Sequence, residues 1–225
     1  DTSVSRGLGD VYKRQAIFGN AGYRDYETNM HPLIFTTPIK PASYYSGRFL
    51  GSFFLTIFIQ LGITLGLAIG FLMPYLDQDA IGIFRLDAYL HPIFVMVIPN
   101  VFLVGAILFS LAILSRRMLP TYLASVILLF GYLTSSNLTS DIETRWIASL
   151  LDPFGGEAIS DLVKYWTPSE RDTLLIPLGK WLVFNRVIWL FVGAFFFLFG
   201  MKKFSFSKEY KFCLLYTSPS PRDTE

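Results

Sequence analysis

The sequence predicts an all-α protein: a polytopic membrane helix bundle with four complete transmembrane helices, a cytoplasmic coupling segment and a small outer helical loop. Hydrophobic residues make up 52% of the 225 residues and charged residues only 16%, whereas soluble domains carry about 25% charged residues. Four stretches, at 49–73, 92–114, 118–133 and 182–201, are dominated by apolar residues. Apolar helices of about 20 residues cross the ~30 Å hydrocarbon core of a bilayer.

Both ends of the chain are predicted to be translated sequencing adapter rather than native protein. Residues 3–15 can be encoded by DNA whose reverse complement, read one base out of frame, encodes residues 213–224 in order. Two unrelated protein ends would not be antisense to each other by chance. We therefore expect 1–15 and 213–225 to be adapter, and 16–212 to be the natural segment.

The first span, 49–73, carries Gly62, Gly66 and Gly70 on one helical face, because they are spaced four residues apart. Small residues at this spacing let two helix backbones approach closely in lipid. The glycine face is expected to be a helix–helix contact. It either slides during a conformational cycle or forms a static packing groove.

The second span, 92–114, follows a polar loop at 75–91 and contains Pro99 and Asn100 well inside its apolar stretch. Proline removes a backbone hydrogen bond and kinks a helix. A polar Asn in the membrane usually faces other helices rather than lipid. Asn100 and Gln60 are therefore candidates for lining a substrate path; the alternative for Asn100 is a place beside a kink whose freed carbonyl finds a partner.

The third span, 118–133, leads into a long polar connection, 134–181, which is expected to form a small helical cap at the membrane surface. Capping-box patterns begin at Ser140 and Thr167 and predict two helix starts in this connection. The fourth span, 182–201, has Arg186 near its beginning, where an arginine can reach lipid headgroups.

The positions of Lys and Arg predict the orientation of the chain. Segments 22–48, 115–117 and 202–212 hold nine basic residues, whereas the loops at 75–91 and 134–181 hold five basic residues among many acids. The first three segments are therefore expected in the cytoplasm and the two loops outside.

No constellation of residues predicts catalysis, a cofactor or a bound metal. His31 and His91 are expected on opposite sides of the membrane, so they cannot share a metal ion. The motifs HExxH, GxSxG and the phosphate-binding glycine loop are absent from the sequence. Asp152 and Glu157 flank a glycine-rich break and are interpreted as helix caps, with paired carboxylates as the alternative. The only cysteine, Cys213, lies in the expected adapter, and a net charge of +2 gives no support to nucleic-acid binding.

Three motifs follow one another in residues 22–48: Arg24-Asp25-Tyr26-Glu27-Thr28, Thr36-Thr37-Pro38-Ile39-Lys40, and Tyr45-Ser46-Gly47-Arg48 at the entrance of the first span. Together they resemble the cytoplasmic segment of permeases of the type-2 ABC exporter class. In that family an acidic residue and a T-P-I-K/R element form a short helix that docks on an ATP-binding cassette subunit. The spans and the outer loop of this chain also resemble the second half of such a six-span unit, although His31-Pro32 departs from the family's usual turn.

Two further motifs resemble a bacterial subgroup in which the permease is fused to a zinc aminopeptidase-like domain. They are Asp152-Pro153-Phe154-Gly155 and Asn185-Arg186-Val187-Ile188-Trp189.

The resemblance implies the permease component of an ATP-driven ABC exporter in the bacterial inner (plasma) membrane. Its implied partners are an ATP-binding cassette ATPase subunit, a second permease half or a second copy of the chain, and the lipid bilayer. The implied ATPase-coupling residues are Arg24, Glu27, Thr37, Pro38, Lys40 and Arg48. For the charged residues Glu27, Lys40 and Arg48, the alternative is an ordinary charge facing solvent or headgroups.

Two other functions stay open. One is a membrane anchor or scaffold for an appended or extracytoplasmic peptidase-like domain, without transport. The other is a secondary transporter, which usually places ionisable residues or broken helices near the membrane midplane. Only Gln60 and the Pro99-Asn100 pair have that character here, and no span core holds a carboxylate.

Overall fold

The computed structural model describes residues 2–70, 85–138 and 145–206, and in this part of the chain all regular elements are helices. The predicted all-α class is therefore confirmed. The end of the first predicted span, most of the loop at 75–91 and the capping box at Ser140 lie outside the described residues.

Four helical runs in the described part are long and apolar enough to cross a membrane. They are α3 (Pro41–Gly70), the run of α4, η1 and α5 (Leu86–Ser115), α6 (Leu119–Leu138) and α10 (Lys180–Lys203). Two of these helices extend beyond the predicted spans. The helix that holds the first span, 49–73, begins at Pro41, and the helix that holds the third span, 118–133, continues to Leu138.

The second span contains a π-helical segment just before Pro99, the residue at which a kink was predicted. It consists of α4 (Leu86–Pro92), η1 (Ile93–Val97) and α5 (Ile98–Ser115). The N–H of Ile98 donates to the carbonyl of Ile93, five residues earlier. Pro99 follows directly and has no N–H of its own, so the regular ladder is already interrupted at this point.

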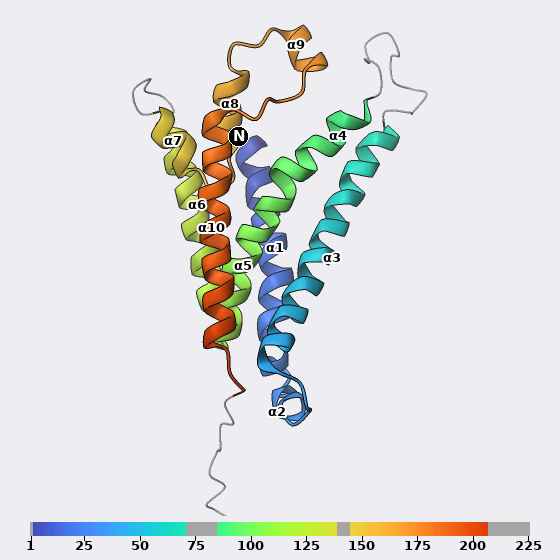
Figure 1. Cartoon of the computed structure of the whole chain (residues 1–225), viewed down its shortest axis with the longest axis vertical. Helices are drawn as coiled ribbons and strands as arrows, with labels where there is room; N and C mark the ends of the chain where they lie inside the picture. The colour runs from blue at the N-terminus through green and yellow to red at the C-terminus, as the bar shows by residue number, and fades with distance from the viewer. Residues whose placement is uncertain (1, 71–84, 139–144, 207–225) are drawn as a thin grey trace, which may run out of the picture.

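Helix α5 is the centre of the bundle and contacts α1 (Thr2–Glu27), α3, α6 and α10 (Figure 1). Phe18 of α1 is fully buried, and a side chain at Gly105 of α5 would overlap its ring. A Cβ on Gly22 would lie 2.8 Å from the Cβ of Ala112. The two helices therefore pack closely through small residues, and α1 continues without a break across the predicted adapter boundary.

The second half of α3 leans away from the bundle (Figure 1). A Cβ added at Gly62, Gly66 or Gly70 would meet nothing within 4 Å. The predicted glycine face is therefore not a helix–helix contact within the described chain. Glycine-mediated packing occurs elsewhere, at Gly22 and Gly105.

The short helices lie at the two ends of the bundle (Figure 1). Helix α2 (His31–Phe35) is at one end; α8 (Gly156–Val163) and α9 (Pro168–Thr173) are at the other. The capping box at Thr167 is confirmed. The Thr167 hydroxyl accepts a hydrogen bond from the N–H of Glu170 (3.3 Å), and the N–H of Thr167 donates to the Glu170 carboxylate (2.8 Å).

Helix α7 (Arg145–Leu151) contacts α6 and α10. The Ser135 hydroxyl of α6 donates to the carbonyl of Ala148, and both residues are fully buried. This part of the predicted outer cap therefore packs against α6 and α10.

Candidate functional site

Residues 22–48, which we call the hook, turn from α1 through α2 into α3 at one end of the bundle (Figure 1). Phe35 of α2 stacks on Phe206 with 4.3 Å between ring centroids, and it meets Tyr44 edge-on at 6.2 Å. Tyr44 in turn stacks on Phe204 at 5.7 Å. These rings tie the hook to the segment that follows α10.

Asp25, Tyr44 and Arg48 form a polar cluster inside the hook. Asp25 of α1 accepts a hydrogen bond from the Tyr44 hydroxyl and forms an ion pair with Arg48 of α3. The Asp25 side chain is only 13% exposed. The resemblance implied that Arg48 contacts a partner protein; in the structure its charge pairs with Asp25 of the same chain. In the sequence, this pair could have been suspected because Asp25 and Arg48 carry opposite charges near the ends of the two helices that the hook connects.

The other implied coupling residues lie on the surface of the hook. Arg24, Glu27, Thr37, Pro38 and Lys40 are exposed. The hydroxyl of Thr37 donates to the carbonyl of Ile34 (2.5 Å), so this threonine also closes the end of α2. Beside these residues lie the exposed apolar side chains of Met30, Leu33 and Ile39. The hook therefore presents a mixed apolar and charged tip.

A second site is a buried polar cluster centred on Arg186 of α10. Its guanidinium donates to the Asn100 side-chain oxygen (2.7 Å) and to the Asn185 side-chain oxygen (2.8 and 3.1 Å). Arg186 is 8% exposed, Asn100 9% and Asn185 fully buried. The expectation that Arg186 reaches lipid headgroups was therefore wrong, because two amide oxygens bind it between the helices.

Asp152 lies beside this cluster and caps α8. Its two carboxylate oxygens accept from the N–H groups of Phe154 (2.8 Å) and Glu157 (2.9 Å), which confirms the predicted cap. The side chain of Asn185 donates to the carbonyls of Asp152 and Ser149, both at 2.7 Å. Burial raises the pKa of the Asp152 carboxyl, and the two N–H donors oppose this rise.

The two motifs that resemble one bacterial subgroup thus meet in space. Gly155 has a positive φ of 74°, and a side chain there would overlap the guanidinium of Arg186. The side-chain amide of Asn100 adds a hydrogen bond to the carbonyl of Phe154 (3.1 Å). Spacing in the sequence gave no signal for this meeting, because α5, the connection and α10 contribute residues far apart in the chain.

Gln60 and Asn100, the two candidates for a substrate path, lie in different surroundings. Gln60 lines a groove of about 280 Å³ together with Ala16 and Ile17 of α1. Asn100 is bonded to Phe154 and Arg186 instead. The structure does not bring the two side chains together.

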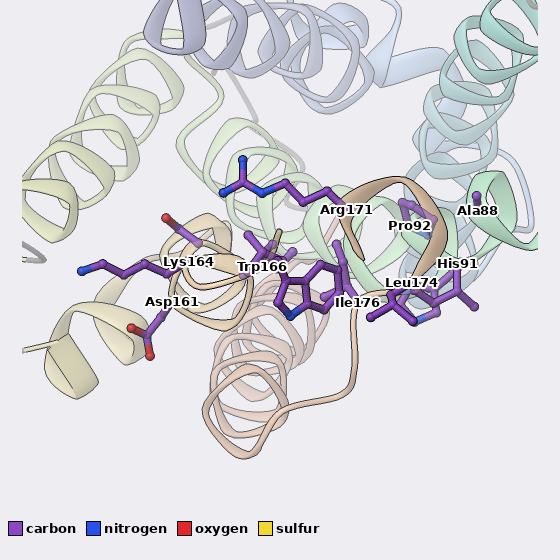
Figure 2. A pocket seen from close by; sticks show the side chains of 13 residues that line it. Ala88, His91, Pro92, Asp161, Lys164, Trp166, Arg171, Leu174 and Ile176 are labelled. Carbon is purple, nitrogen blue, oxygen red and sulfur yellow. The ribbon is translucent and has the colours of Figure 1, made fainter. Parts of the chain in front are cut away.

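A larger pocket, of about 670 Å³, lies at the end opposite the hook, and we call it the cap pocket (Figure 2). Residues of α4, of α8 and its C-terminal flank, and of α9 and the segment after it form its wall. They are Ala88, His91, Pro92, Ile159, Ser160, Asp161, Val163, Lys164, Trp166, Arg171, Leu174, Leu175 and Ile176. Among the described residues, no group of three or more His, Cys, Asp or Glu side chains is placed to hold a metal ion.

These features define a helical membrane protein with four candidate spans, an exposed hook at one end and a pocket at the other. Comparison of the chain with protein-family models, with curated proteins and with solved structures finds no match.

Proposed function

We propose that the protein is the permease component of an ATP-driven transporter of the type-2 ABC exporter class in a bacterial inner membrane. The hook is the docking point for an ATP-binding cassette subunit. One observation supports this proposal. The tip of the hook is exposed, whereas Asp25, Arg48 and Phe35 connect the rest of the hook to the long helices. Such a segment can receive a displacement from a soluble partner and pass it to the bundle.

The contacts of the hook define a path for this displacement. The Asp25–Arg48 ion pair joins α1 to α3, and the ring of Phe35 joins α2 to Phe206 beyond α10. Within the part of the hook that belongs to α3, the fully buried Tyr45 shares a hydrogen bond (2.7 Å) with Ser110 of α5. A push on the tip is therefore distributed over several helices at once.

The proposal places the hook, the turn at 115–117 and the segment at 202–212 in the cytoplasm. Its support is that described residues of all three lie at one end of the bundle. The guanidinium of Arg116 is 5.2 Å from the centroid of the Tyr26 ring, and Phe204 stacks on Tyr44. Basic residues in all three segments favour the cytoplasmic side.

Cysteine labelling tests this orientation. In a Cys213→Ser background, Leu33→Cys places a thiol on the hook and Tyr165→Cys places one at the opposite end; the native side chains are 65% and 82% exposed. A membrane-impermeant maleimide is expected to label Tyr165→Cys on intact cells and Leu33→Cys only after permeabilisation. The reverse pattern would overturn the proposal.

Charge reversal tests the docking function. Glu27→Lys is expected to weaken co-purification with a co-expressed ATP-binding cassette subunit, because Glu27 lies at the exposed tip. Lys180→Glu, an exposed charge at the start of α10, is the matched control and is expected to keep the wild-type association. If Glu27→Lys leaves both association and transport unchanged, Glu27 is not part of the docking contact.

A further inference from the structure

The cap pocket has the dimensions and the lining of a binding site rather than of a packing defect. Its volume of about 670 Å³ lies within the range of roughly 300–1,000 Å³ that is usual for small-molecule sites. Figure 2 shows Trp166, Ile176, Leu174 and Pro92 around its centre, with His91 beside them. The middle of the pocket is therefore mainly apolar.

The charged side chains of the cap pocket lie at its rim. Lys164 and Arg171 extend away from Trp166 in Figure 2, and Asp161 lies on the same side as Lys164. Both basic residues are exposed. Two cations against one carboxylate leave a net positive rim next to an apolar interior, which complements a ligand with an anionic head and an apolar tail.

The cap pocket lies at one end of a candidate span. Ala88, His91 and Pro92 belong to the first two turns of the helical run Leu86–Ser115. At the same end, Trp146 and Trp181 pack together with 6.1 Å between ring centroids. Tryptophan is enriched at the level of lipid headgroups.

We propose that the cap pocket binds an anionic amphiphile, a molecule with a phosphate headgroup and an acyl chain. The acyl chain lies along Trp166, Leu174 and Ile176, and the phosphate lies at the rim between Lys164 and Arg171. This inference concerns the end of the bundle opposite the hook and does not depend on a transport function.

A photoactivatable lysophosphatidylglycerol with a diazirine in its acyl chain is the probe, applied to the full chain in phosphatidylcholine nanodiscs. We expect its cross-links to map to 159–176 and 88–92. Lysophosphatidylcholine with the same chain, which has no net charge, is expected to cross-link at least about fivefold less. Inorganic phosphate at the same concentration is expected not to compete, because it lacks the apolar tail.

Two kinds of variant separate the rim from the interior. Lys164→Gln and Arg171→Gln are each expected to lower cross-linking by about fivefold, the effect of one cation near an anionic headgroup. Ala88→Trp is expected to block the pocket and abolish cross-linking without removing a charge. Lys180→Gln and Tyr89→Trp, which alter residues outside the pocket lining, are the matched controls and are expected to behave as wild type.

Three results would overturn the proposal. Full competition by inorganic phosphate would identify a site for free anions. An equal loss in Lys180→Gln would mean that the probe responds only to the general surface charge. Undiminished cross-linking in Ala88→Trp would place the probe outside the cap pocket.

Discussion

At the scale of single residues, the contact between Gly155 and Arg186 determines how the connection between α7 and α8 meets α10. Gly155 adopts a left-handed conformation, which costs other residues about 1–2 kcal/mol. Its missing side chain also leaves the space that the Arg186 guanidinium occupies. One residue thus meets two requirements, a backbone turn and a close approach.

Gly155→Ala is expected to lower the unfolding free energy by at least about 1–2 kcal/mol, because it adds backbone strain and displaces Arg186. Thermal unfolding in detergent measures the effect. Gly131→Ala in α6 is the matched control, since its Cβ would lie an ordinary 3.9 Å from Pro153. This control is expected to gain up to about 1 kcal/mol from helix propensity, and equal stability of the two variants would contradict the packing argument.

The buried Asp152 carboxyl predicts a pH dependence of stability. Its pKa is raised above the ordinary value of 3.8 by burial, so the folded protein binds this proton more tightly than the unfolded chain. The contribution of Asp152 to the free energy of unfolding is therefore largest below pH 3.8. It declines as the pH rises through the raised pKa of the folded protein. Asp152→Asn, which keeps one acceptor oxygen, is expected to reduce this decline in unfolding experiments from about pH 4 upward. If the unfolding free energy of Asp152→Asn fell with pH as steeply as that of the wild type, Asp152 would not be the group responsible.

At the scale of elements, α2 is too short to be stable alone and depends on its aromatic contacts. Phe35 provides most of them, with Phe206, Tyr44, Tyr26 and Phe204 as partners. The helix therefore keeps its place because α1, α3 and the segment after α10 surround this ring. In the proposed function, these contacts convert a force on α2 into a movement of the spans.

Phe35→Ala is expected to loosen α2, since each lost aromatic pair contributes about 0.5–1.5 kcal/mol. Hydrogen exchange at the amides of Ile34 and Thr37, which bond to the carbonyls of Met30 and Ile34, is expected to accelerate by at least about tenfold. Leu33→Ala on the exposed side of α2 is the control and is expected to change the exchange little. Equal acceleration in both variants would mean that the ring contacts do not hold the helix.

At the scale of the whole molecule, the bundle is tight around α5 and open along α3. Gly193 of α10 lies within 3.2 Å of Leu103 of α5, measured from the position of an added Cβ, whereas Gly66 of α3 has nothing within 4 Å. One end of α3 belongs to the core through Tyr45 and Phe49, and the other end does not. In the proposed assembly, this open face is available to a second copy of the chain.

Gly66→Leu is expected to leave the unfolding temperature of the single chain unchanged or slightly higher, because the added side chain meets no neighbour and Gly disfavours helices. It is expected to weaken self-association, measured by energy transfer between labelled copies in nanodiscs, because a bulky residue prevents close helix approach. Gly193→Leu is the control and is expected to lower the unfolding temperature. A similar loss in Gly66→Leu would show that this face is already packed.

Features that depend on residues close together in the chain could be predicted from the sequence. Four apolar stretches predicted the candidate spans, and the capping box at Thr167 and the cap by Asp152 were predicted from local pattern. The hydropathy of a stretch and the hydrogen bonds of a capping side chain each depend on a few neighbouring residues, so both can be predicted from the sequence. The ends of the helices could not be read from the apolar stretches, because α3 and α6 continue into polar residues.

Contacts between residues far apart in the chain became visible in the packed helices. Arg186 lies between Asn100 and Asn185, Arg48 pairs with Asp25, and close helix packing occurs at Gly22 rather than at Gly66. These contacts depend on which helices lie side by side and how each is rotated. Apolar helices with polar residues on several faces are compatible with many such arrangements, and the packing of the whole bundle selects one.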